Sequence, residues 1–131
     1  MSCPSLYAKL RELHPESNRF FVFEYDNRFA AYGDAFVLYD YREPTKLPET
    51  ILAQGFDMVI ADPPFLSEEC ATKVAETISA LQPTHILYCT GWKLLYVCTR
   101  IYVTVLACAD LVTFADHTLS RVSFNVLAFH V

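Results

Sequence analysis

Apolar residues in the first 39 positions alternate between helical and strand spacing. Those between residues 6 and 13 recur at helical spacing and predict a helix. The aromatic run 20–25 predicts a strand, and Asp26 can cap a short helix that Gly33 closes. A second aromatic strand is expected at 35–39. The chain therefore begins with alternating helices and strands.

The middle of the chain continues this alternation. The apolar run 56–61 is nearly continuous, which is typical of a strand buried on both faces of a parallel sheet. Ser67 can cap a following helix whose apolar stripe ends at Leu81, and residues 85–89 supply one more short strand. Strands that alternate with helices of this length predict an α/β fold with a doubly wound sheet.

The pattern changes near Trp92. Residues 93–131 contain no glycine or proline and few charged residues, and β-branched and aromatic residues dominate. Extra strands are the plainest interpretation, because the uncharged runs are too short to span a bilayer. We therefore divide the chain into an α/β unit, residues 1–91, and a divergent segment, residues 92–131, that completes or packs on the same domain.

Composition and charge narrow the classes of function. Hydrophobic residues make up 53% of the chain, which is ample for a packed core. Ten Lys and Arg against fifteen Asp and Glu give a net charge of -5, which disfavours binding to nucleic-acid phosphate. Five cysteines without a C-x-x-C pair and four scattered histidines predict neither disulfides nor a metal site. A reducing, cytoplasmic setting fits best, and no secretion signal is recognised.

Acidic and aromatic residues follow two of the predicted strands. Glu24 and Tyr25 end the first strand, and Asp40 and Tyr41 follow the second. In an open α/β sheet, ligands bind at the carboxyl ends of the strands. One carboxylate there can accept both hydroxyls of a ribose and the next can accept an adenine amino group. Each residue alone is equally typical of a cap or turn, but their joint placement ahead of Asp62 favours a nucleoside pocket.

The most specific signal is the segment Asp62-Pro63-Pro64-Phe65, which ends the buried strand. Two adjacent prolines hold the backbone rigid. The carboxylate of Asp62 and the carbonyl of Pro63 can hold the hydrogens of an attacking amine, and Phe65 can cover a flat base or a lysine stem. The plain alternative is a rigid corner after a strand. We interpret the segment as the target-amine clamp of an N-methyltransferase.

Several segments resemble one known family, the eukaryotic translation elongation factor 1-alpha lysine methyltransferases, earlier labelled adenine-specific DNA methyltransferases. The resemblance covers about residues 3–91. The segments that carry it are Phe-Glu-Tyr-Asp-x-Arg-Phe at 23–29, Tyr32-Gly33, Tyr39-Asp40-Tyr41 and the run 57–70 around Asp62-Pro63-Pro64-Phe65.

This resemblance implies a Rossmann-like (class I) methyltransferase fold, S-adenosyl-L-methionine as cofactor and a lysine of elongation factor 1-alpha as target. By the family pattern, Glu24 would hold the cofactor ribose, Asp40 the adenine, and the segment from Asp62 to Phe65 the substrate amine. Tyr25, Tyr41 and Asp62 are the further residues expected at the cofactor.

Two departures from the family pattern shape the expected fold. The chain begins at about the loop that follows the family's first strand, which lies between the second and fourth strands. We therefore expect an incomplete Rossmann-like sheet that lacks this strand and leaves two edges unpaired. Similarity is expected to stop after Gly91, so the chain is interpreted as a truncated or alternatively spliced form with an irregular apolar C-terminal extension.

Three functions are compatible with these sequence features. The first is a protein-lysine N-methyltransferase. The second is an adenine amino-group DNA methyltransferase, against which the lack of a basic surface counts. The third is a non-catalytic truncated isoform or interaction fragment that pairs its exposed sheet edges with a partner. Neither a membrane nor a nucleic acid is expected as a partner.

Overall fold

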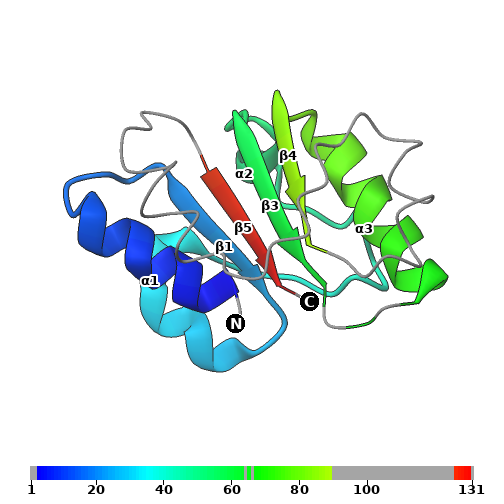
Figure 1. Cartoon of the computed structure of the whole chain (residues 1–131), viewed down its shortest axis with the longest axis horizontal. Coiled ribbons are helices and arrows are strands. Elements are labelled where there is room, and N and C mark those ends of the chain that lie inside the picture. The colour runs from blue at the N-terminus through cyan, green and yellow to red at the C-terminus, as the bar shows by residue number, and fades with distance from the viewer. Residues whose placement is uncertain (1–2, 64, 66, 90–125, 131) are drawn as a thin grey trace.

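A five-stranded parallel sheet forms the centre of the computed structural model, which describes residues 3–63, 65, 67–89 and 126–130. The strand order is β2-β1-β5-β3-β4, and every neighbouring pair is parallel (Figure 1). The strands are β1 (Phe20–Glu24), β2 (Phe36–Leu38), β3 (Met58–Asp62), β4 (His85–Tyr88) and β5 (Val126–His130).

Helices connect these strands much as the periodicity predicts. They are α1 (Cys3–Leu13), the 3-10 helix η1 (Asn27–Ala35), α2 (Glu49–Leu52) and α3 (Glu68–Leu81). The Asp26 side chain caps η1, and Gly33 bends that helix with a positive φ of 63° instead of ending it. The Ser67 side chain caps α3 as expected. The short helix α2 was not predicted.

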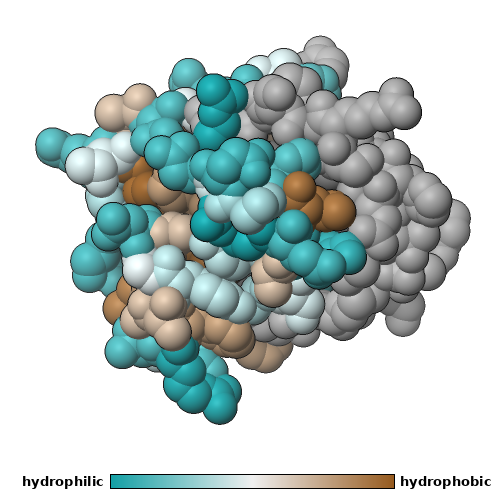
Figure 2. All heavy atoms as spheres, turned by 90° about the vertical axis from the view of Figure 1, so that its left-hand side faces the viewer, coloured by the Kyte–Doolittle hydropathy of each residue, from teal (hydrophilic) through white to brown (hydrophobic). Residues whose placement is uncertain are grey.

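Both faces of the sheet are covered, which explains why its strands are apolar almost throughout. One core lies beneath α1 and contains Leu6, Tyr7, Leu10, Phe20, Val22, Ile60 and Leu87. The other lies beneath α3 and includes Phe23, Tyr39, Val59, Ala61, Cys70, Val74 and Ile78. Successive residues of β1 and β3 therefore enter opposite cores. The outer side near α1 is mostly hydrophilic with small separate hydrophobic areas (Figure 2).

The central strand comes from the end of the chain. β5 pairs with β1 from Phe20↔Val126 to Phe23↔Phe129, and with β3 from Met58↔Val126 to Asp62↔His130. The two strand edges that we expected to be unpaired are therefore paired, and that part of the prediction is wrong. The expectation of an irregular tail is also wrong for Val126–His130, while residues 90–125 lie outside the described residues.

This strand placement has a physical basis in composition. The uncharged, β-branched and aromatic run 122–131 suits a strand that is enclosed on both edges. Extra strands were expected in this segment, but nothing local in the sequence indicates a central position. Among the described residues, no helix is long and apolar enough to cross a membrane.

Substituting Ala128 by proline tests the central position of β5. Proline removes a backbone N–H, and in a strand paired on both sides it interrupts the ladder and leaves a buried carbonyl oxygen without its donor, at a cost of about 1–3 kcal/mol. We expect Ala128→Pro to lower the free energy of unfolding by that order in urea titrations. Ala128→Ser, which keeps the N–H at similar side-chain size, is the matched control. Equal stability of Ala128→Pro and Ala128→Ser would contradict the central placement.

Candidate functional site

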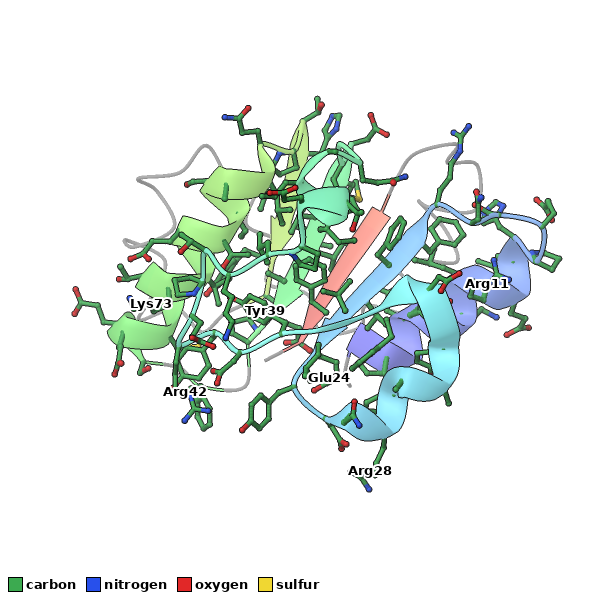
Figure 3. All side chains as sticks on the ribbon, turned by 180° about the vertical axis from the view of Figure 1, so that it is seen from behind. Arg11, Glu24, Arg28, Tyr39, Arg42 and Lys73 are labelled. Carbon is green, nitrogen blue, oxygen red and sulfur yellow. The ribbon has the colours of Figure 1, made fainter. Side chains whose placement is uncertain are left out.

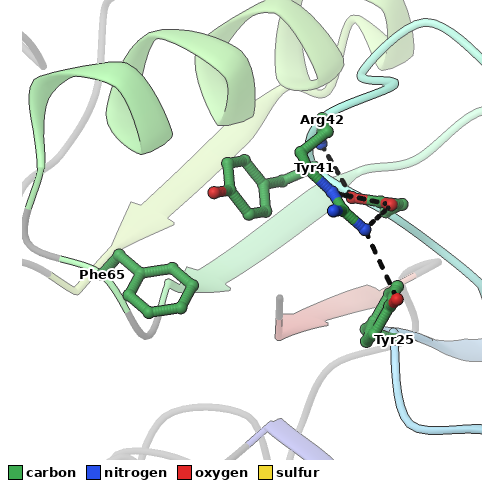
Figure 4. Close-up of a pocket in the computed structure, with 5 residues that line it drawn as sticks. Tyr25, Tyr41, Arg42 and Phe65 are labelled. Atoms are coloured by element: carbon green, nitrogen blue, oxygen red, sulfur yellow. Dashed lines mark hydrogen bonds and ion pairs between the residues drawn. The ribbon is translucent and has the colours of Figure 1, made fainter.

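A cavity of about 350 Å³ opens at the carboxyl ends of the strands, and five of the described residues line it: Tyr25, Asp40, Tyr41, Arg42 and Phe65 (Figure 4). They come from three separate parts of the chain, following β1, β2 and β3. Four of the five are residues that the sequence predicted for the cofactor or the substrate amine. The topology therefore brings predicted residues of both kinds into one cavity.

Glu24 ends β1 at this edge of the sheet and is 4% exposed. Its Oε1 accepts hydrogen bonds from the backbone N–H groups of Tyr25 at 3.0 Å and Asp26 at 3.2 Å. The carboxylate thus holds the turn that follows its own strand. Figure 3 shows Glu24 and Arg42 at the same edge of the sheet. Glu24 does not line the cavity, whereas Tyr25, which is 55% exposed, does.

Asp40 and Arg42 form a forked ion pair at the cavity wall. Arg42 Nε lies 2.9 Å from Oδ1 and 3.0 Å from Oδ2 of Asp40, and Nη2 lies 2.6 Å from Oδ2. The Arg42 backbone N–H also donates to Oδ1 at 3.0 Å. The side-chain hydrogen bonds from Arg42 hold the pKa of Asp40 below its ordinary value. Asp40 is therefore an ionised acceptor at neutral pH.

A buried hydroxyl chain anchors the loop that carries Asp40 and Arg42. The Tyr39 hydroxyl lies 2.7 Å from Thr77 Oγ1, which lies 2.8 Å from the Pro44 carbonyl oxygen. Thr77 has one hydroxyl hydrogen and the carbonyl can only accept, so Thr77 donates to Pro44 and Tyr39 donates to Thr77. This chain fixes both ends of the loop against α3.

The Asp62-Pro63-Pro64-Phe65 segment begins at the last residue of β3, so it ends that strand as predicted. Asp62 is half-buried, and its Cα is in register with that of His130 at the end of β5. Pro63 is buried, whereas Phe65 is 54% exposed. The Phe65 ring centroid lies 6.0 Å from that of Tyr41, with 53° between the ring planes. Phe65 thus extends from the clamp segment to the wall of the cavity.

The predicted residues consequently fall into three groups. Tyr25, Asp40, Tyr41 and Phe65 line the cavity; Glu24, Asp62 and Pro63 lie at the same sheet edge without lining it; Pro64 lies outside the described residues. The roles assigned to them stay predictions. Within the described ranges, no group of three or more His, Cys, Asp or Glu side chains could hold a metal ion.

Sequence reasoning missed Arg42, although a signal for it exists. The spacing Asp-x-Arg occurs twice, at 26–28 and at 40–42, each time just after a strand. In both copies the aspartate accepts from the backbone N–H of the arginine and forms a forked pair with its guanidinium. We name these the two Asp-x-Arg turns. An arginine two residues after a strand-terminal aspartate could have been predicted to reach back to it.

We expect Tyr39→Phe to destabilise the fold by about 1–2 kcal/mol, because it removes a buried hydrogen bond to Thr77. Burial raises the pKa of Tyr39 from 10.0 to about 12 in the folded chain. The folded state therefore binds the hydroxyl proton of Tyr39 more tightly than the unfolded state does. The stabilisation that this protonated hydroxyl contributes is complete below pH 10 and is lost as the pH rises towards 12.

Urea titrations of the wild type and Tyr39→Phe at pH 8 to 12 measure both effects. The wild type should lose more stability than the variant over the alkaline range. Tyr32→Phe is the matched control, since Tyr32 packs through ring contacts with Tyr7 and Phe29. Parallel alkaline losses in the wild type and Tyr39→Phe would count against the buried hydroxyl chain.

Comparison with protein families matches residues 1–127 to a family described as probable N6-adenine methyltransferase. The family match extends past Gly91, whereas the alignments with the mouse and human relatives below span 91 residues, so the expectation that similarity stops at Gly91 stays a prediction. Among curated proteins, a mouse protein named EEF1A lysine methyltransferase 1 is 57% identical over 91 residues, and a human protein of the same name is 56% identical over 91 residues.

A protein-lysine N-methyltransferase of Drosophila melanogaster is 41% identical over 97 residues. Each of these three alignments covers 70% of this chain and 42% of the relative. The chain therefore spans about two fifths of the length of these curated relatives. No solved structure matches the chain.

Proposed function

The chain belongs to the family described as probable N6-adenine methyltransferase, and from that premise we propose an S-adenosyl-L-methionine-dependent N-methyltransferase acting on a lysine of translation elongation factor 1-alpha. The names of the curated relatives support the lysine target. One observation carries the proposal: residues predicted for the cofactor and for the amine clamp line one cavity. The class I fold and a cytoplasmic setting belong to the same proposal.

The residues at the cavity suit the nucleoside half of this cofactor. Asp40 offers a hydrogen-bond acceptor, while Tyr25, Tyr41 and Phe65 offer aromatic surfaces for a flat base. A volume of about 350 Å³ lies within the range of small-molecule sites. Glu24, at the end of the neighbouring strand, is the proposed ribose partner. When bound, S-adenosyl-L-methionine supplies the methyl group for transfer.

The residues at the end of β3 suit a substrate amine that accepts the methyl group. In this proposal the Asp62 carboxylate and the Pro63 carbonyl accept hydrogens of the lysine amine and aim its lone pair, which is a contribution from orientation. The amine must lose its ammonium proton before it can attack. The exposed Phe65 ring then lies against the lysine stem, where an aromatic face also favours the cation before deprotonation.

An adenine amino group is the second candidate target. The description of the family favours it, and Phe65 would stack equally well on a base. The net charge of -5 counts against it, because binding to DNA draws most of its affinity from contacts between basic residues and phosphates. A protein lysine is therefore the preferred target.

Methyl transfer from labelled S-adenosyl-L-methionine to purified elongation factor 1-alpha and to oligonucleotides tests both targets. We expect label in the protein, and a loss of about 100-fold in rate for Asp62→Asn, the usual scale for removing one aligned polar group. Asp57→Asn is the matched control, because Asp57 directly precedes the opposite end of β3.

Label in the oligonucleotide alone would replace the lysine target with adenine. A folded chain that binds the cofactor but labels neither substrate would favour the non-catalytic fragment. An equal loss of rate in Asp62→Asn and Asp57→Asn would remove Asp62 from the amine clamp.

A further inference from the structure

Arg42 connects the two strand ends that form the cavity. Besides its fork on Asp40, its Nη2 donates to the Tyr25 hydroxyl at 3.4 Å, and its Cζ lies 5.7 Å from the centroid of the Tyr25 ring. Figure 4 shows the hydrogen bond that joins Arg42 to Tyr25. A single guanidinium thus holds a residue that follows β1 and a residue that follows β2.

The hydrogen bonds from Arg42 limit how many acceptor positions of the Asp40 carboxylate remain available to a ligand. An ionised carboxylate has about four acceptor positions, two on each oxygen. The Arg42 backbone N–H donates to Oδ1, Nη2 donates to Oδ2, and the single Nε hydrogen is shared between the two oxygens. Three donor hydrogens therefore reach the four acceptor positions. Among the described contacts, one position remains on a carboxylate whose residue lines the cavity.

A carboxylate oxygen that can only accept a hydrogen bond distinguishes adenine from hypoxanthine. The 6-amino group of adenine can donate a hydrogen bond to it. The 6-oxo group of hypoxanthine is itself an acceptor, so it would face the Asp40 oxygen with no hydrogen between them and would be repelled. Without the fork, the ionised carboxylate would still only accept hydrogen bonds, but it could rotate away from the 6-position of either purine. The selectivity would then fall.

We propose that Arg42 is a positioning residue that makes the cavity selective for a 6-aminopurine over a 6-oxopurine, by presenting Asp40 as a fixed acceptor. The inference rests on the proposed function, since it places an adenosyl cofactor in this cavity. It goes further by assigning the choice of base to an arginine that acts through Asp40. The depressed pKa of Asp40 agrees with this role.

A purely structural role for this ion pair is the competing explanation. Arg42 is largely exposed, and exposed pairs contribute little to stability. The other Asp-x-Arg turn supplies an internal comparison, because Arg28 Nε lies 3.0 and 2.7 Å from the two Asp26 carboxylate oxygens. This second pair has the same fork but does not line the cavity. Replacing Arg28 by alanine therefore shows how much an Asp-x-Arg turn contributes to the fold at a place where no ligand is proposed to bind.

Calorimetric titration of the full chain with S-adenosylhomocysteine and its deaminated analogue S-inosylhomocysteine tests the proposal. The wild type should bind the adenosyl compound about tenfold more tightly or better, the scale of one hydrogen bond to a charged group. In Arg42→Ala this ratio should fall to about threefold or less. Arg42→Lys should lie between them, because an ammonium cannot fork a carboxylate. Arg28→Ala should keep the wild-type ratio.

The outcomes separate this inference from the function on which it rests. A wild type that binds neither compound would overturn both. A wild type that binds without preference, or an Arg42→Ala variant that weakens both compounds while keeping their ratio, would overturn the role of Arg42 alone. Circular dichroism establishes that each variant is folded. If Arg42→Ala does not fold, Arg42→Lys decides the matter, and an unchanged ratio in it would overturn the proposal.

Discussion

The pairing of β5 with β1 on one edge and β3 on the other holds the sheet together. β1 and β2 form one half and β3 and β4 the other, and among the described strands the two halves are joined by the ladders of β5. The cavity depends on this arrangement, because Tyr25 and Asp40 follow strands of the first half and Phe65 follows a strand of the second. The central strand therefore sets the distance between the predicted cofactor residues and the predicted amine clamp.

A second connection crosses between the halves above the sheet. The hydroxyl chain from Tyr39 through Thr77 ties the loop after β2 to α3, which follows β3. The core beneath α3 joins side chains of β1, β2, β3 and β4 on the same face. Backbone ladders and side-chain packing thus both hold the two halves of the sheet in place. The position of the loop that carries Asp40 therefore depends on these long-range contacts as well as on its own turn.

Local features of the fold could be predicted from the sequence, and long-range ones could not. The apolar run of β3 and the Ser67 cap of α3 are encoded within a few residues, and both are found. The place of Val126–His130 depends on pairing with residues more than 60 positions away. A single sequence does not indicate which residues of two distant strands lie opposite each other. The ends of β1 and β2 were predicted to meet, but the contact of Arg42 with Tyr25 depends on side-chain directions that spacing does not give.

The electrostatics of the sheet edge bear on the choice between lysine and adenine. Glu24, Asp40 and Asp62 lie at this edge, and two arginines that follow the same strands, Arg28 and Arg42, are both held by aspartates. A DNA phosphate approaching here would therefore compete with Asp26 and Asp40 for the two guanidinium groups. A lysine ammonium would instead approach carboxylates, and its attraction would weaken with added salt in the usual way. The described surface thus favours a cationic target over a polyanionic one.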